Sequence, residues 1–477
     1  MAPEVRRPRR LSDTVRLVQV AVGVVVFGVA LGGCVSFQAK PIVPRDVLHD
    51  LQRVRLEGLT AAAPAPYDAP VPHFDLSDGL STDEAVAVAL FLNPGLRAFR
   101  KERGVAEGEV VAAGVLPNAE LEVTWLHIEN FTKSLATSGF DVNLRWSPPR
   151  PGERGARRAQ AEARLANVRA QIADEEWRLA ADVRKAHAAL WGAQERLRLA
   201  DTALALQERV RRFLRDKRTL GDASRLEVNL VELEYTETLR ERETIVADEE
   251  RTRQEFNRAL GLPPLSVTRL QTRDGFAYRP LRLSSAVLET VMVERRPDLK
   301  AAQEEYEQSQ QALRVAHIQR IPWFRFGPSF ERDGAPGEVS INKLALGVGI
   351  DIPLANLNRG ELLRLEAERD KLRETFTAKV HAGRAEVGEA LRVLRTQERL
   401  VRLFEDVIRP ALDENAQLTD AALELGDVNV LQFVTAQSKV LKGRREGIEA
   451  RLGYWQAVFD LERAMGSRVD EVEGREE

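Results

Sequence analysis

The chain has 477 residues, of which 30% are charged and only 6% are aromatic, and its formal net charge is −3. This near balance of charge gives no reason to expect a nucleic acid as a partner, and a single cysteine excludes a disulfide framework or a metal site built from several cysteines. The composition favours long helices that bury narrow apolar stripes over one compact core.

The first 33 residues have the pattern of a secretory signal peptide. A start with five arginines is followed by a 15-residue apolar run, Leu17 to Leu31, and by two glycines. The alternative is a transmembrane anchor, but the run is short for a helix that crosses a bilayer. The following segment, residues 34–79, is loose and rich in proline and alanine, and we expect it to form an extended tether.

The remainder of the chain repeats itself. LFLNPGLRAF at 90–99 returns as VERRPDLKAA at 293–302, and RALG at 258–261 returns as RAMG at 463–466. These intervals are 203 and 205 residues, and other matching motifs keep the second of them. The sequence therefore predicts a tandem duplication. Its parts are a first repeat at 80–261, a linker at 262–282, a second repeat at 283–466 and a disordered tail at 467–477.

Each repeat begins with a helix and ends with two long helical stretches. Ser81 and Glu84 have the spacing of a capping box, and the Asn93–Pro94 step should interrupt the helix that they start. Apolar residues within the long stretches follow a heptad pattern, which predicts coiled-coil packing. The long stretches are predicted at 154–219 and 223–261, and at 359–424 and 428–466.

Two strand-like runs lie between the helices of each repeat. In FDVNLRW (140–146) apolar and polar residues alternate, and LALGVGIDI (344–352) repeats the pattern, with less regular partners around Leu121 and Trp323. Such alternation fits surface hairpins on a helical protein as well as the wall of a transmembrane barrel. A barrel wall cannot have open edges in hydrocarbon, and four strands cannot close one, so a barrel requires two or more chains.

One short motif resembles the lipobox of bacterial lipoproteins. This motif is LGGC at 31–34, and the resemblance implies that Cys34 becomes the lipid-modified first residue of the mature chain and carries palmitate. Val35 stands where many inner-membrane lipoproteins have aspartate, which implies the outer membrane as the destination. Lipid chains would anchor the protein by burying methylene groups.

The repeated motifs NPGLRA and RPDLKA, the prolines at the strand exits and the LGD turns resemble the TolC-like outer-membrane factors, from about Leu80 to Gly466. The resemblance implies a mainly α fold with a small β-barrel part. Three chains would share one twelve-stranded barrel in the outer membrane, and their long helices would form a hollow periplasmic α-barrel. The strand exits at Pro148 and Ile352 are most similar to the branch that serves heavy-metal pumps of the resistance-nodulation-division type.

The same resemblance implies a function and partners. The chain would be the exit duct of a tripartite efflux pump in a Gram-negative bacterium. It would receive small toxic solutes or metal ions from an inner-membrane pump and a periplasmic adaptor. Alternatives are the exit duct of a type I protein secretion system, and a lipid-anchored periplasmic coiled-coil protein without a pore. A pore-less protein would not need alternating strands in each repeat.

Within the family, the turns between paired helices form the periplasmic tip that meets the adaptor. An acidic residue often narrows the pore just after such a turn, which implies Glu227 in the first repeat; a solvated carboxylate is the alternative. Gln432 and Thr435 occupy the corresponding region of the second repeat, where aspartate is common. The tip residues are Leu220, Gly221, Asp222 and Ala223 in the first repeat and Leu425, Gly426, Asp427 and Val428 in the second.

Catalytic and metal-binding motifs are missing from the sequence. It contains no HExxH, nucleophile elbow, P-loop or GxGxxG motif, so we expect neither enzymatic activity nor a cofactor. The six histidines are scattered and the three methionines form no cluster, so we expect no metal site.

Overall fold

The chain divides into two compact units, Met1–Val54 and Arg55–Glu477. The computed structural model describes residues 38–54, 79–130, 135–221, 223–266, 269, 276–334, 341–351, 357–425 and 430–473. Cys34 and the predicted signal peptide therefore lie outside the described residues.

In the first unit, Pro44–Arg53 form helix α2, with proline at its first turn and no buried residue. The prediction of an extended tether is wrong for this stretch, because Pro44 fixes a helical φ and an apolar stripe follows it.

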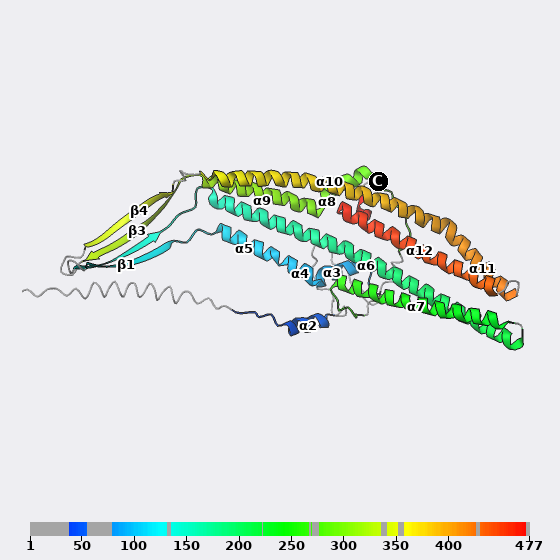
Figure 1. The fold of residues 1–477 in the computed structure, drawn as a ribbon. Helices are drawn as coiled ribbons and strands as arrows, with labels where there is room; N and C mark the ends of the chain where they lie inside the picture. The colour runs from blue at the N-terminus through cyan, green and yellow to red at the C-terminus, as the bar shows by residue number, and fades with distance from the viewer. Residues whose placement is uncertain are drawn as a thin grey trace, which may run out of the picture. The chain divides into compact units, whose positions relative to one another are not determined.

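The second unit repeats one order of elements (Figure 1). The first repeat contains α3 (Thr82–Leu92), α4 (Pro94–Arg100), α5 (Glu102–Gly114), β1 (Glu120–Asn130), β2 (Leu135–Arg145), α6 (Glu153–Leu220) and α7 (Arg225–Leu260). The second contains α8 (Ser285–Arg295), α9 (Pro297–Gln319), β3 (Trp323–Gly334), β4 (Ile341–Asp351), α10 (Arg359–Leu403), the π-helix η2 (Phe404–Ile408), α11 (Arg409–Leu425) and α12 (Val430–Met465). A short helix, α13 (Val469–Glu473), follows. The prediction of a mainly α chain with four strands is confirmed.

The helix boundaries of the first repeat follow from local sequence. The backbone N–H of Ser81 donates to Glu84 Oε2 at 2.9 Å, and the N–H of Glu84 donates to Ser81 Oγ at 3.3 Å. This is the predicted capping box, and it starts α3. Asn93 ends α3 and caps α4, where its Oδ1 accepts from the N–H of Leu96 at 3.1 Å. The predicted interruption at Asn93–Pro94 is confirmed.

The long helices pack as two antiparallel pairs. The first stretch of the first repeat, α6, has 68 residues and is about 100 Å long at about 1.5 Å per residue. α7 packs against α6, α12 against α10 and α11, and α12 against α6, so the two pairs lie side by side (Figure 1). α9 fills the space between α6 and α10. Among the described helices, none combines the length and the hydropathy needed to cross a membrane.

The long stretch of the second repeat is interrupted, against the prediction of a continuous helix. The π-helix η2 separates α10 from α11. Phe404 at its start is 5% exposed, and a Cβ added to Gly447 of α12 would collide with its ring. The wider turn therefore lets α11 approach α12 closely where Gly447 leaves room, and such local π-turns change the course of a helix.

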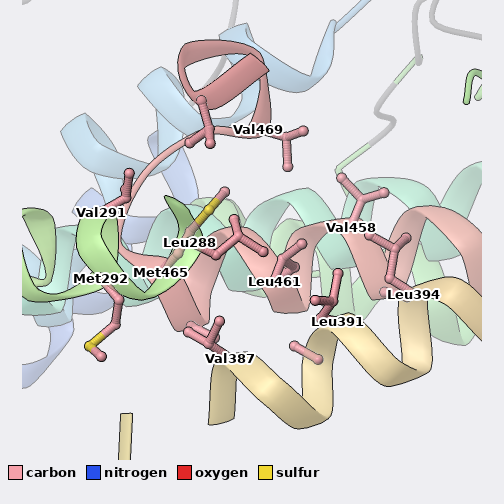
Figure 2. Close-up of a cluster of buried hydrophobic side chains, with 14 of the residues drawn as sticks. Leu288, Val291, Met292, Val387, Leu391, Leu394, Val458, Leu461, Met465 and Val469 are labelled. Atoms are coloured by element: carbon pink, nitrogen blue, oxygen red, sulfur yellow. The ribbon is translucent and has the colours of Figure 1, made fainter. Parts of the chain in front are cut away.

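One hydrophobic cluster joins α8, α10, α12 and α13 (Figure 2). Leu288, Met292 and Leu461 are fully buried in it. Val469 and Val472 of α13 pack on the same cluster at 0% and 1% exposure. The prediction of a disordered tail is therefore wrong for residues 467–473; residues 474–477 lie outside the described part.

A buried carboxylate also holds α13. Glu462 Oε1 accepts from the N–H of Val469 at 3.1 Å, and Glu462 Oε2 lies 3.4 Å from Arg184 Nη1. Burial raises the pKa of Glu462 and lowers the pKa of Arg184, because desolvation of these charges outweighs their attraction. The pair therefore orients the chain end at α6 more than it stabilises the fold.

Each repeat closes with the same backbone contact. Gly261 and Gly466 end α7 and α12 at φ values of 80° and 74°. A Cβ at Gly261 would lie 2.9 Å from Asn93 Cα, and one at Gly466 would lie 2.7 Å from Arg296 Cα. The break before Pro94 or Pro297 thus rests directly on the end of the last long helix. We call these two contacts the repeat clasps.

A side chain completes each clasp. Asn93 Nδ2 donates to the carbonyl oxygen of Ala259 at 3.2 Å, and Arg296 Nη1 donates to that of Ala464 at 3.0 Å. The two acceptors are separated by the 205-residue interval of the duplication. Both donors satisfy a helix C-terminal carbonyl, which has no partner within its own helix.

We expect Gly261→Ala and Gly466→Ala each to lower the free energy of unfolding by at least about 2 kcal/mol, because a left-handed conformation and a backbone collision add. Denaturant titration of the detergent-solubilised protein measures this change. Gly388→Ala is the control, since its Cβ meets nothing within 4 Å and alanine favours a helix. Equal midpoints for all three variants would contradict the clasps.

Candidate functional site

The four strands form one antiparallel sheet in the order β1-β2-β3-β4. β1 pairs with β2 and β3 with β4 as two hairpins, and β2–β3 pairing joins the hairpins and thereby the two repeats. Among the described strands, β1 and β4 each have a neighbour on one side only. Their other edges present unpaired backbone groups.

One face of this sheet is apolar and exposed on all four strands. Trp125 of β1 is 72% exposed and Leu344 of β4 is 81% exposed. The ring of Phe140 lies 6.4 Å from that of Trp125 and 5.6 Å from that of Phe330, so the apolar face continues across β1, β2 and β3. A soluble monomer rarely exposes an apolar patch of this extent. Further exposed members are Leu121, Val123, Leu144, Phe324, Leu346, Val348 and Ile350.

The opposite face is polar and carries paired charges. Arg145 of β2 forms an ion pair with Glu122 of β1. Across the second hairpin, Lys343 Nζ lies 3.3 Å from Glu331 Oε1. Arg325 and Asp351 pair near the helical end of β3 and β4, at 3.7 Å. The predicted alternation of faces is therefore confirmed for the described strand residues.

The turn of the first repeat ends α6 at a glycine. Gly221 adopts φ 88°, and its N–H donates to the carbonyl oxygen of Arg218 at 3.1 Å, as at a glycine C-cap. Leu220 before it is 76% exposed. Ala223 is half-buried, and Asp222 lies outside the described residues.

Glu227 has a local role besides its expected place at the pore. The N–H of Ser224 donates to Glu227 Oε2 at 2.7 Å, and the N–H of Glu227 donates to Ser224 Oγ at 3.2 Å. These bonds form a capping box at the start of α7. The hydrogen bond from the Ser224 backbone lowers the pKa of Glu227. Ser224–Glu227 has the same spacing as Ser81–Glu84, so the signal was present in the sequence.

The turn of the second repeat is described only in part. Leu425 ends α11, and Gly426, Asp427 and Val428 lie outside the described residues. Gln432 and Thr435 lie in the first turns of α12 and are exposed, and at the 205-residue interval Gln432 corresponds to Glu227.

A buried phenylalanine brings the two turns together. Phe433 of α12 is 1% exposed and packs against Val210 and Leu214 of α6 and Val231 of α7. The described helix ends beside the two turns therefore belong to one packed bundle end, although they are about 200 residues apart in sequence.

The helical part contains a hollow of about 780 Å³ lined by α6, α9, α10 and α12. Arg296 lies in its wall and pairs with Asp298 at 2.8 Å and Glu386 at 2.6 Å. These ion pairs hold Arg296, whose side chain completes the second clasp. The charges therefore have a structural role. Across the described residues, no group of three histidine, cysteine or acidic side chains could hold a metal ion.

We expect Glu227→Ala to reduce amide protection in the first turn of α7, and Glu227→Gln to keep it, since glutamine also closes a capping box. The lowered pKa means that the stabilisation by ionised Glu227 is present above its ordinary pKa of 4.5 and is lost as pH falls through the folded value. Hydrogen exchange across this range should show the loss in the parent chain and not in the glutamine variant. Equal protection in the alanine variant would contradict the cap.

Three comparisons with known proteins agree with this architecture. A family profile described as outer membrane efflux protein matches residues 291–467. Over 394 residues the chain is 23% identical to the cobalt-zinc-cadmium resistance protein CzcC of Cupriavidus metallidurans, which covers 81% of this chain and 90% of the relative.

Solved structures share the fold at low sequence identity. A membrane protein from Pseudomonas aeruginosa has a TM-score of 0.66 at 18% identity, over 85% of this chain and 98% of that one. The open state of the Neisseria gonorrhoeae MtrE outer membrane channel has a TM-score of 0.61 at 18% identity, over 81% and 89%. Profile, sequence relative and fold confirm the resemblance inferred from the repeated motifs: the second repeat matches the outer membrane efflux protein profile, and the chain as a whole is similar to such proteins in sequence and fold.

Proposed function

We propose that this chain is the outer-membrane exit duct of a tripartite efflux pump. The observation that carries the proposal is a four-stranded sheet that exposes a continuous apolar face, leaves both edges unpaired and continues into helices of up to 68 residues. A pore-less coiled-coil protein has no use for such a sheet. The duct passes its cargo without chemical change.

The sheet has the dimensions of a membrane-spanning wall. Its strands have 11 or 12 residues, which at about 3.3 Å per residue extend over about 36 Å. A tilted strand needs about 9 to 11 residues to cross the hydrocarbon core. The exposed apolar face contacts lipid, and the face with the Glu122–Arg145 and Glu331–Lys343 pairs faces the lumen.

The open edges require more than one chain. Unpaired backbone groups are costly in hydrocarbon, so β1 of one copy pairs with β4 of the next until the wall closes. Three copies give twelve strands, and this number comes from the resemblance to the TolC-like factors. The long helices of three copies then enclose a periplasmic tunnel.

The two helical turns form the periplasmic end of the duct. Leu220, Gly221 and Ala223, with Leu425 of the second repeat, are proposed to contact a periplasmic adaptor that links the duct to an inner-membrane pump. Glu227 and its counterpart Gln432 are exposed beside these turns, where they would line the pore entrance. Thr435 lies one turn further along α12.

The cargo is proposed to be small toxic solutes or metal ions. The relative from Cupriavidus metallidurans carries cobalt, zinc and cadmium resistance in its name. In a duct, such ions are cargo and need no resident metal site. Cys34 is proposed to carry the lipid that anchors the mature chain in the outer membrane of a Gram-negative bacterium.

We expect light scattering of the detergent-purified protein to give the mass of three chains, and planar bilayers to show stable conductance. Cys34→Ser should abolish labelling by a palmitate analogue and leave both readings unchanged, because the barrel holds the protein in the membrane. A Cys34→Ser monomer that stays soluble without detergent would overturn the duct and favour the pore-less protein.

We expect Leu346→Arg at the centre of β4 to destabilise the protein by about 2 to 4 kcal/mol, the cost of arginine at the lipid-facing midplane of a barrel. Ala345→Arg places the same side chain one residue away on the opposite face, toward the lumen, and should cost much less. Denaturant midpoints of both variants folded into lipid vesicles measure the difference. Equal costs would argue against a lipid-facing sheet.

A further inference from the structure

A hollow of about 450 Å³ lies where the start of α3, the middle of α6, the end of α12 and the start of α13 meet. The linker between the repeats forms a further side of it, through Phe276, Ala277 and Arg279. It shares no lining residue with the hollow beside Arg296. Small-molecule sites commonly measure about 300 to 1,000 Å³ and combine aromatic walls with a few placed polar groups. The hollow between α3 and α12 has both features.

Three aromatic rings form one wall of this hollow. The ring of Phe276 lies 5.7 Å from that of Trp455 and 6.5 Å from that of Phe459, and the last two are 5.9 Å apart. The indole N–H of Trp455 donates to the carbonyl oxygen of Ala277 at 3.3 Å, which holds the linker against α12. Phe276 adopts φ 36°, a left-handed conformation that is strained for an aromatic residue, and such strain clusters at ligand sites. The wall offers a flat ring a surface on which to stack.

Three arginines, Arg184, Arg279 and Arg468, also line the hollow. The side chain of Arg184 is only 7% exposed, and its Nη1 lies 3.4 Å from Glu462 Oε2. Desolvation lowers the pKa of Arg184 despite the attraction of Glu462, and the nearby guanidinium of Arg468 lowers it further. A second negative group in the hollow would therefore be stabilised by the two guanidiniums.

Among the described residues, one edge of the Arg468 guanidinium has no hydrogen-bonded acceptor. Its Nη1 donates to Asp83 Oδ2 at 3.2 Å. Its Nη2 lies 3.7 Å from Asp470 Oδ2, which is beyond hydrogen-bond length, and its buried Nε has no partner in the described part of the chain. The Nε–Nη2 edge has the fork geometry that binds both oxygens of a carboxylate.

The carboxylates that line the hollow already have partners, so the group without one is a donor and the fitting ligand group is an acceptor. The N-terminus of α3, whose first residues line the hollow, adds partial positive charge. A cationic ligand would have to compete with three guanidiniums for the same carboxylates. The existing ion pairs are Asp83–Arg468, Asp470–Arg279 and Glu462–Arg184.

We infer that this hollow binds a small aromatic carboxylate, with its ring on the aromatic wall and its carboxylate on the Nε–Nη2 edge of Arg468. The site goes beyond the proposed function and does not depend on it, since every group that forms the site belongs to one chain. The bound molecule would contact the start of the first repeat and the end of the second at once, because α3, α12 and α13 all line the hollow.

Fluorine NMR of the detergent-solubilised full chain tests the site with 4-fluorobenzoate as the probe. We expect line broadening that saturates as the probe concentration rises. The matched probe is 4-fluorobenzylamine, which has the same ring and the opposite charge and should show no saturable broadening. Saturable binding of the amine in place of the benzoate would overturn the inference. The absence of saturable broadening with both probes would also overturn it, and would indicate that water fills the hollow.

Two substitutions in the full chain separate the guanidinium edge from the aromatic wall. Arg468→Lys keeps the positive charge and loses the fork, so 4-fluorobenzoate should bind about tenfold more weakly. Trp455→Leu removes one ring and should weaken binding by about two- to tenfold. Arg463→Lys is the matched control on α12, because Arg463 pairs with Asp182 and does not line this hollow; it should bind the probe as the parent chain does.

The variants also exclude binding elsewhere. Equal broadening in the parent chain and in both test variants would assign the signal to the detergent and overturn the site. A chain that is monomeric by light scattering and shows no conductance, yet binds 4-fluorobenzoate through Arg468, would refute the duct and support the site. A conducting trimer that does not bind the probe would do the reverse.

Discussion

The unpaired edges of β1 and β4 are the constraint on which the rest of the molecule depends. In the proposed duct, backbone N–H and C=O groups at these edges have no water to bind in hydrocarbon, so the sheet would be complete only when neighbouring copies add their strands. The apolar face and the edges belong together: the face brings the sheet into lipid, and lipid makes the open edges costly. For the proposed duct, assembly is thus a condition of membrane insertion.

The helical part joins the two repeats that carry the hairpins. The repeat clasps set where each short helix meets the end of its long helix pair, by backbone contact at Gly261 and Gly466. The β2–β3 pairing and the packing of α12 on α6 then join the repeats at both ends. β1 and α7 then lie at the edge of the first repeat, and β4 and α11 lie at the edge of the second.

The spacing of apolar residues predicted most of the fold, because strands and coiled-coil helices each have a characteristic spacing that can be read from a single sequence. The α3 capping box, the Asn93–Pro94 break and the faces of β2 and β4 followed from local rules. The π-turn at Phe404 did not, because it depends on the space above Gly447 in a distant helix. Val469 and Val472 were missed because their burial comes from α8 and α12. Glu227 was assigned a pore role by resemblance, although its spacing from Ser224 already indicated a cap.

The clasps also bear on how the duplication diverged. The side-chain amide of Asn93 and the guanidinium of Arg296 donate to equivalent carbonyl oxygens. The two repeats therefore use different side chains for the same hydrogen bond to the backbone. Arg296 also forms ion pairs with Asp298 and Glu386, whereas its counterpart Asn93 has no charge to be neutralised. The two halves therefore share the positions of the glycines and prolines in the clasps, while the side chains around these positions differ between the halves.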